Sequence, residues 1–196
     1  MTKWICHPHD NRDTKLVPVF HRAFDVKSKL QHAELLISSH GLYEALLNGS
    51  EITENKFTPG FTSYYHRIQY QKYNVTAFLK EGCNSLRITV GDGWWRWNNN
   101  FGYTLALWCK LKLTYTDGSV ELVESDETFD VGVGSIIRTD LQEGETYDAR
   151  FEPRGWYKAK VCKEHTEGEL IIIVKLMEGV LFLMKVNGNE NKKERQ

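Results

Sequence analysis

The clearest pattern in this chain is the run Leu105-Ala106-Leu107-Trp108-Cys109-Lys110-Leu111-Lys112-Leu113-Thr114-Tyr115. Every second residue of this run, counted from its first leucine, is apolar. Successive side chains of a β-strand point to opposite faces, so this period of two predicts a strand with one face against a core. The shorter run 85–90 has the same period, which predicts a second strand of this kind.

Short strand-like segments continue on both sides of these two runs, and turn signals separate them. The further segments that we expect to form strands are 17–24, 33–38, 42–47, 64–73, 120–123, 128–131, 136–137 and 157–162. Asn48-Gly49 and Asp117-Gly118 are predicted hairpin turns, because these residues accept positive φ. Residues 74–82 predict one helical turn, closed by a glycine. No helical period lasts beyond two turns, so the predicted class is all-β, an antiparallel β-sandwich.

The composition narrows the classes of function. The chain has 196 residues, 41% of them hydrophobic, which is enough for one packed core. Its net charge of −1 and the lack of a clustered basic face argue against a nucleic-acid partner. The four cysteines lie at 6, 83, 109 and 162, without metal or redox spacing. Because no apolar leader follows Met1, we expect free thiols and a cytoplasmic location.

The last thirty residues differ in texture from the rest. We predict one β-sandwich domain over residues 1–165, followed over 166–196 by a divergent β-hairpin and a polar tail. The apolar segments 170–174 and 180–184 are too short and too interrupted by charge to span a membrane. If its edge is open, the strand at Ile171–Ile173 predicts pairing with a second copy, that is, a homodimer.

The run Gly91-Asp92-Gly93-Trp94-Trp95-Arg96-Trp97-Asn98-Asn99-Asn100 holds three tryptophans in four residues. One interpretation is an aromatic platform that stacks on a sugar ring, because soluble domains seldom expose large aromatic surfaces without a partner. The other is a set of core residues at the end of a sheet, because tryptophan is usually mostly buried. Arg96 could stack on a neighbouring indole or point to solvent.

An ordered series of short motifs gives the chain a family resemblance. The motifs are Trp4-Ile5, Phe20-His21-Arg22-Ala23-Phe24, Ala33-Glu34-Leu35-Leu36-Ile37-Ser38, Gly41-Leu42-Tyr43-Glu44, Leu47-Asn48-Gly49, Pro59-Gly60-Phe61-Thr62-Ser63-Tyr64, Tyr70-Gln71-Lys72-Tyr73-Asn74-Val75-Thr76, Gly82-Cys83-Asn84, Gly91-Asp92-Gly93-Trp94-Trp95, Gly144-Glu145-Thr146-Tyr147-Asp148-Ala149-Arg150 and Gly155-Trp156. In this order, over roughly residues 4–160, they resemble the N-terminal accessory domain of bacterial α-L-rhamnosidases, glycoside hydrolase family 78.

The resemblance implies a jelly-roll sandwich of the galactose-binding-domain-like kind and an accessory role. In full-length enzymes of the family, this module precedes further β-domains and an (α/α) barrel whose carboxylates hydrolyse α-L-rhamnosides. In some members the module itself binds a terminal rhamnose with the help of calcium. On this basis we expect sugar binding at Asn48, Gly49, Asp92, Trp95 and Trp97, and calcium binding at Asp92 and Asp140. The other interpretation is that Asn48-Gly49 only makes a turn and that Asp92 only caps its loop.

No catalytic residue is predicted in this chain. Inverting glycosidases need two carboxylates about 6.5–9.5 Å apart across a sugar-sized cleft. The acidic residues Glu143, Glu145 and Asp148 lie in one short segment, and we expect Asp148 to pair with Arg150. The barrel is expected to lie outside this chain, which should therefore be inactive alone. The alternative role is that of a domain that packs on a catalytic partner or a second copy and binds no ligand.

Overall fold

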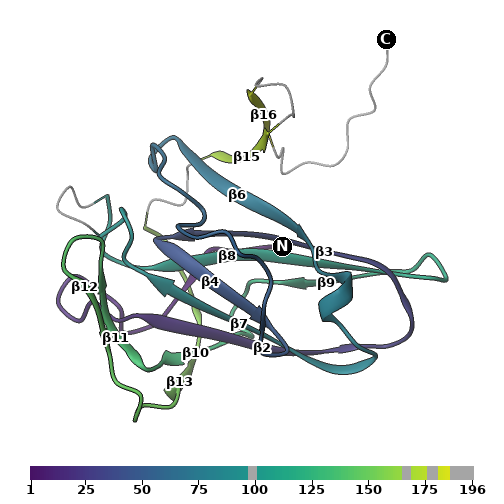
Figure 1. The fold of residues 1–196 in the computed structure, drawn as a ribbon, viewed down its shortest axis with the longest axis horizontal. Coiled ribbons are helices and arrows are strands. Elements are labelled where there is room, and N and C mark those ends of the chain that lie inside the picture. The colour runs from purple at the N-terminus through teal and green to yellow at the C-terminus, as the bar shows by residue number, and fades with distance from the viewer. Residues whose placement is uncertain (97–100, 165–168, 176–180, 186–196) are drawn as a thin grey trace.

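The computed structural model describes residues 1–96, 101–164, 169–175 and 181–185, and β-strands dominate these ranges (Figure 1). The elements are β1 (Ile5–Cys6), β2 (Pro18–Val26), β3 (Leu30–His40), β4 (Leu42–Leu47), β5 (Ser50–Glu51), β6 (Arg67–Asn74), the 3-10 helix η1 (Thr76–Phe78), β7 (Gly82–Gly91), β8 (Ala106–Tyr115), β9 (Val120–Glu124), β10 (Asp130–Val133), β11 (Ile136–Asp140), β12 (Gly144–Tyr147), β13 (Arg154–Lys158), β14 (Lys160–Val161), β15 (Glu169–Lys175) and β16 (Leu181–Lys185). Across these ranges, no helix is long and apolar enough to cross a membrane.

Two sheets face each other as a sandwich. The larger sheet has the order β14-β1-β8-β3-β6-β15-β16, with β9 also paired to β8, and the smaller has the order β13-β10-β2-β7-β4-β5. Among the described pairings only β6 with β15 is parallel, and the others are antiparallel. The predicted all-β antiparallel sandwich is confirmed.

The core lies where the two strongest sequence patterns place it. From β8, the side chains of Leu107, Cys109, Leu111 and Leu113 are fully buried between the sheets. From β7, Leu86, Ile88 and Val90 meet them from the opposite sheet, also without exposure. The alternation therefore identifies the face of each strand that lies on this core, although Ala106 and Trp108 of β8 are also buried on the other face.

A hairpin of β11 and β12 forms an arm at one end of the sandwich, on the left in Figure 1. This β11–β12 arm contacts the end of β7, where a Cβ built on Gly91 would lie 3.0 Å from the Thr139 hydroxyl oxygen. The same hydroxyl accepts a hydrogen bond of 2.8 Å from the backbone N–H of Asp92. The arm thus stands over one face of the smaller sheet and walls a cleft.

The segments predicted as strands all contain strands in the structure, and Asn48-Gly49 joins β4 to β5 as the expected hairpin turn. The sequence pattern missed β1, β5 and β12, which have two, two and four residues. The strands of the predicted C-terminal hairpin pair antiparallel as β15 and β16. Its connection at 176–180 and the predicted polar tail at 186–196 lie outside the described residues.

The free strand edge at Ile171–Ile173, through which we expected a dimer to form, is not present in the structure, and dimerisation itself stays a prediction. One edge of β15 is paired with β6 and the other with β16, so the strand offers no free edge to a second chain. The sequence could not reveal this, because pairing with β6 joins segments about a hundred residues apart.

Candidate functional site: a cleft between the smaller sheet and the β11–β12 arm

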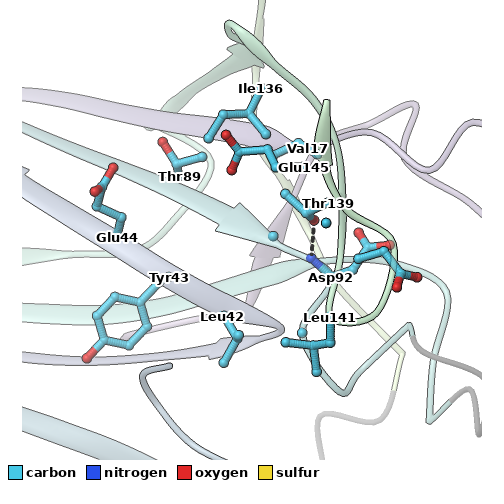
Figure 2. Close-up of a pocket in the computed structure, with 14 residues that line it drawn as sticks. Val17, Leu42, Tyr43, Glu44, Thr89, Asp92, Ile136, Thr139, Leu141 and Glu145 are labelled. Atoms are coloured by element: carbon cyan, nitrogen blue, oxygen red, sulfur yellow. Dashed lines mark hydrogen bonds between the residues drawn. The ribbon is translucent and has the colours of Figure 1, made fainter. Parts of the chain in front are cut away.

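A cleft of about 350 Å³ lies between the β11–β12 arm and the ends of β4 and β7 (Figure 2). Its lining combines two kinds of group, carboxylates or hydroxyls and aliphatic side chains. The polar side chains in the lining are Glu44, Thr89, Asp92, Thr139, Asp140 and Glu145, and the aliphatic ones are Val17, Leu42, Ile136 and Leu141. The predicted residues Asp92 and Asp140, 48 positions apart in the sequence, therefore meet at one cleft.

The buried side chain of Arg96 holds the Asp92 carboxylate in place. The carboxylate of Asp92 accepts a hydrogen bond of 3.0 Å from Arg96 Nε, and Arg96 Nη2 lies 2.7 Å from the same oxygen. Arg96 Nη1 donates to Asp10 Oδ1 at 2.8 Å, and Asp10 Oδ2 accepts from the backbone N–H of Leu105. Burial raises the pKa of both Asp92 and Asp10, and the Arg96 guanidinium opposes this shift.

The Asp10–Arg96–Asp92 network was not predicted. Arg96 does not point to solvent; it is 5% exposed and joins the N-terminal segment to the tryptophan loop. A buried arginine requires a carboxylate partner, but the sequence does not show that Arg96 is buried. The partner 86 positions away could not be identified without the fold.

Asp140 and Glu145 carry the negative charge that the arm brings to the cleft. Asp140 Oδ1 accepts hydrogen bonds from the backbone N–H groups of Gln142 and Glu143, at 2.7 and 2.9 Å. These bonds hold the pKa of Asp140 below its usual value, so its carboxylate is ionised at neutral pH. Glu145 is exposed and lines the same cleft.

Trp95 does not form a sugar platform. Its indole is fully buried, stacks on the His40 ring with centroids 4.0 Å apart, and donates a hydrogen bond to the carbonyl of Thr104. His40 stacks in turn on Trp4. Because the Trp95 side chain has no exposed surface, a sugar ring has no access to it. Trp97 lies outside the described residues.

Asn48 and Gly49 lie away from the cleft. The side-chain amide of Asn48 donates to the carbonyl of Phe78 and to Asn84, and its oxygen accepts from the N–H of Ser85. This amide therefore joins the β4–β5 turn to neighbouring segments. Gly49, with φ of +84°, completes the turn and lines a different hollow. Asn48 and Gly49 therefore make the turn that the alternative interpretation predicted, and sugar binding at this dipeptide stays a prediction.

The structure also locates Asp148, one of the acidic residues considered for catalysis. Asp148 forms the expected ion pair with Arg150, with 2.6 Å between Oδ2 and Nη2, in a turn after β12. Among the described residues, no group of three or more His, Cys, Asp or Glu side chains has an arrangement that could hold a metal ion. In the same ranges the four cysteines are free thiols, as expected.

The two-sheet antiparallel sandwich, with a side cleft walled by a hairpin arm, places the chain in the class of jelly-roll domains. The family model of the α-L-rhamnosidase N-terminal domain matches residues 28–186. The chain belongs to this family of α-L-rhamnosidase N-terminal domains.

Individual α-L-rhamnosidases that resemble this chain support the same assignment. An α-L-rhamnosidase of Streptomyces avermitilis is 39% identical over 134 residues, which is 65% of this chain and 13% of that protein. The structure of an α-L-rhamnosidase from Aspergillus terreus matches 83% of this chain with a TM-score of 0.78 and 31% identity. The Streptomyces avermitilis enzyme complexed with L-rhamnose matches 82% with a TM-score of 0.74 and 30% identity. This chain covers 21% and 18% of those two structures, so it corresponds to a small part of each enzyme.

Proposed function

We propose that this domain recognises the substrate of an α-L-rhamnosidase by binding L-rhamnose, or a closely related sugar, in the cleft beside the β11–β12 arm. The observation that carries the proposal is the mixed lining of that cleft. L-Rhamnose is a 6-deoxy sugar, so it presents a methyl group on one side and adjacent hydroxyls on the other. Ile136 and Leu141 suit the methyl group, and the carboxylates of Asp140 and Glu145 accept hydrogen bonds from hydroxyls.

Calcium forms the second part of the proposal. Calcium takes six to eight oxygen ligands, including backbone carbonyls and water. Asp140 is the carboxylate of the cleft that would hold it, because the Asp92 carboxylate is hydrogen-bonded to Arg96 and Glu145, opposite Thr139, points to the other face of the hairpin. One carboxylate leaves most of the coordination to carbonyls, water and the sugar hydroxyls, so we expect calcium to bind weakly without sugar.

A thermal-shift titration with L-rhamnose, in calcium and in a chelator, tests both parts. Sugar at ten times its dissociation constant should stabilise the domain by about 1.4 kcal/mol, a Tm rise of roughly 3–5 °C at this size. Asp140→Asn should reduce the shift, whereas Asp148→Asn, outside the cleft, should leave it unchanged. No shift at tens of millimolar rhamnose would contradict sugar binding, and equal shifts in chelator would remove calcium from the proposal.

A second candidate function is packing against a catalytic partner, and an exposed aromatic group favours it. Phe57, Phe61 and Tyr65 are 62%, 58% and 47% exposed at one end of the sandwich. Phe61 lies 5.9 Å from Trp94 between ring centroids, so these rings form one surface. If the same surface instead paired two copies, light scattering would give a dimer mass that Phe61→Ser lowers to the monomer.

A further inference from the structure

A second hollow lies on the outer face of the smaller sheet, and the proposed rhamnose cleft does not use it. We call it the Arg87 groove; it has a volume of about 610 Å³. Its lining residues are His21, Leu46, Gly49, Ser85, Arg87, Asp130, Pro153 and Trp156. Arg87 lies two positions before Thr89 on β7, and Thr89 lines the rhamnose cleft. The two hollows therefore open on the same sheet face, about 7 Å apart along this strand.

The floor of the Arg87 groove is a row of side chains in register across four strands. Leu46 of β4 is opposite Arg87 of β7, which is opposite His21 of β2. His21 is in turn opposite Asp130 of β10. Directly opposite residues lie about 5 Å apart, so Arg87, His21 and Asp130 form a continuous polar strip with Leu46 at its end. Ser85 supports it through a 3.0 Å hydrogen bond between its hydroxyl and His21 Nε2.

Trp156 forms one wall of the groove, and the neighbouring Gly132 leaves room for its ring. A Cβ built on Gly132 would lie 3.3 Å from the Trp156 ring and 2.6 Å from the carbonyl oxygen of Arg154. The absence of a side chain at Gly132 thus lets the indole lie across β10 toward β2. Its ring centroid is 5.9 Å from that of His21, yet Trp156 remains 45% exposed. The indole therefore presents open surface to the groove.

The distances across the sheet suit one sugar ring. Neighbouring strands are about 4.8 Å apart, and Arg87 lies one strand beyond His21. His21 thus has Trp156 on one side and Arg87 on the other, so a ligand as small as one pyranose ring can contact the indole and the guanidinium together. A six-membered sugar ring has an apolar face that can stack on an indole.

The charge of the groove is uneven. Asp130 forms an ion pair with Lys158 at 2.5 Å, which neutralises the acid of the row. Arg87 is exposed and forms no ion pair with any residue in the part of the chain that the structure describes. A guanidinium binds a carboxylate through two parallel hydrogen bonds, which a neutral hydroxyl cannot match.

We propose that the Arg87 groove binds a sugar that carries a carboxylate, that is, a uronic acid residue of a glycan. The ring stacks on Trp156, the carboxylate meets Arg87, and His21 with Ser85 contacts the ring hydroxyls. This proposal goes beyond rhamnose recognition, because the groove, the residues and the charge of the ligand differ from those of the cleft.

Methyl β-D-glucuronide and methyl β-D-glucoside, which differ in the carboxylate, test the proposal by NMR titration of the chain. The glucuronide should shift the Trp156 indole N–H signal, assigned with Trp156→Phe, and bind at least tenfold more tightly than the glucoside. Arg87→Gln should weaken glucuronide binding at least tenfold, and Arg87→Lys should weaken it less. Arg150→Gln, which removes an exposed arginine elsewhere, should change nothing.

Equal binding of the two glycosides, binding that is insensitive to Arg87→Gln, or no binding at 50 mM glucuronide would each overturn the proposal. Unchanged circular dichroism and Tm of Arg87→Gln establish that the variant is folded, which its exposed position favours. L-Rhamnose is titrated into the same samples. Arg87→Gln should bind rhamnose normally and Asp140→Asn should bind glucuronide normally, so the failure of one site is distinguishable from the failure of the other.

Discussion

Arg96 is the residue on which the site depends most, although it does not line the cleft. Its guanidinium lies between Asp92, which faces the cleft, and Asp10, which is buried in the N-terminal segment. Arg96 also donates to the carbonyl of Leu16. One side chain therefore sets the position of the Gly91–Gly93 loop relative to the start of the chain.

Replacement of Arg96 by methionine should destabilise the domain strongly. The change leaves two buried carboxyls without their cation, and breaking a buried pair costs about 3–5 kcal/mol in the free energy of unfolding. Urea unfolding of the two proteins measures this difference. Arg150→Met is the matched control, because it removes an arginine–aspartate pair that is exposed, and it should leave the unfolding midpoint nearly unchanged. Equal effects of the two changes would show that the Arg96 network is not structural.

His7 makes stability depend on pH. It is 3% exposed, and its Nδ1 accepts a hydrogen bond of 3.1 Å from the N–H of His9, which requires a neutral ring. Burial lowers the pKa of His7 to about 4, from 6.5 in the unfolded chain. Stability is therefore fully present above pH 6.5 and is lost as the pH falls, because the unfolded chain then binds the proton.

When the pH falls from 7.5 to 5.0, His7 should lower the free energy of unfolding by up to about 2 kcal/mol. In His7→Gln the amide oxygen can still accept the bond from His9, so this variant should lose less stability over the same interval. Urea titrations of both proteins at the two pH values check the difference. Identical pH slopes would show that His7 titrates normally in the fold.

At the scale of elements, the crossing between the two sheets depends on Gly41, between β3 and β4. Its φ is +118°, and a Cβ there would lie 2.2 Å from the carbonyl oxygen of Gly91 on β7. That oxygen belongs to backbone at the end of a core strand, so it cannot move aside as a flexible side chain would. Glycine at this position lets the two sheets approach each other at the edge of the cleft.

Gly41→Ala should therefore lower the free energy of unfolding several times more than a substitution that changes only the backbone preference. We expect roughly 3–5 kcal/mol for Gly41→Ala, as for other strained and overpacked sites. Gly118→Ala, at a hairpin with φ of +85° and open space around the Cβ, should cost about 1 kcal/mol. Unfolding free energies of both variants test the ratio, and a similar cost for the two would mean that the contact with Gly91 relaxes.

The elements themselves were predictable to the extent that their pattern was local. β7 and β8 alternate over most of their length, so the faces that they bury between the sheets follow from the sequence. β1 has two residues and no period, and its place beside β8 comes from distant pairing. The parallel pairing of β15 with β6 likewise depends on chain topology and not on local composition.

At the scale of the whole molecule, the candidate site was predictable only in part. The family resemblance indicated Asp92 and Asp140, and the arm does bring both to one cleft. It also indicated Trp95, which is buried beneath Tyr64 and His40. Composition cannot distinguish a buried tryptophan from an exposed one, because the difference lies in the segments that fold over it. Trp156, which walls the Arg87 groove, was predicted only as part of a motif.

We expect the isolated chain to show no rhamnosidase activity. Glycoside hydrolysis requires one carboxyl that can donate a proton and a second that stays ionised, across a sugar-sized space. Asp92 and Asp140 line one cleft, and burial does raise the pKa of Asp92. However, the Arg96 guanidinium opposes this shift and occupies Asp92 Oδ1 with two contacts, so this carboxyl is engaged by a cation within the protein.

An aryl α-L-rhamnoside assay on the purified chain measures this directly, with nitrophenol release at the buffer rate as the expected result. Asp140→Asn and Asp92→Asn are assayed beside the unmodified chain, so that a contaminating hydrolase, whose rate neither change affects, is recognised. A rate above buffer that falls in either variant would show that the cleft is catalytic. Such a result would show that the cleft hydrolyses the sugar and does not only recognise it. Loss of rate on removing one carboxylate identifies a group that acts on the glycosidic bond.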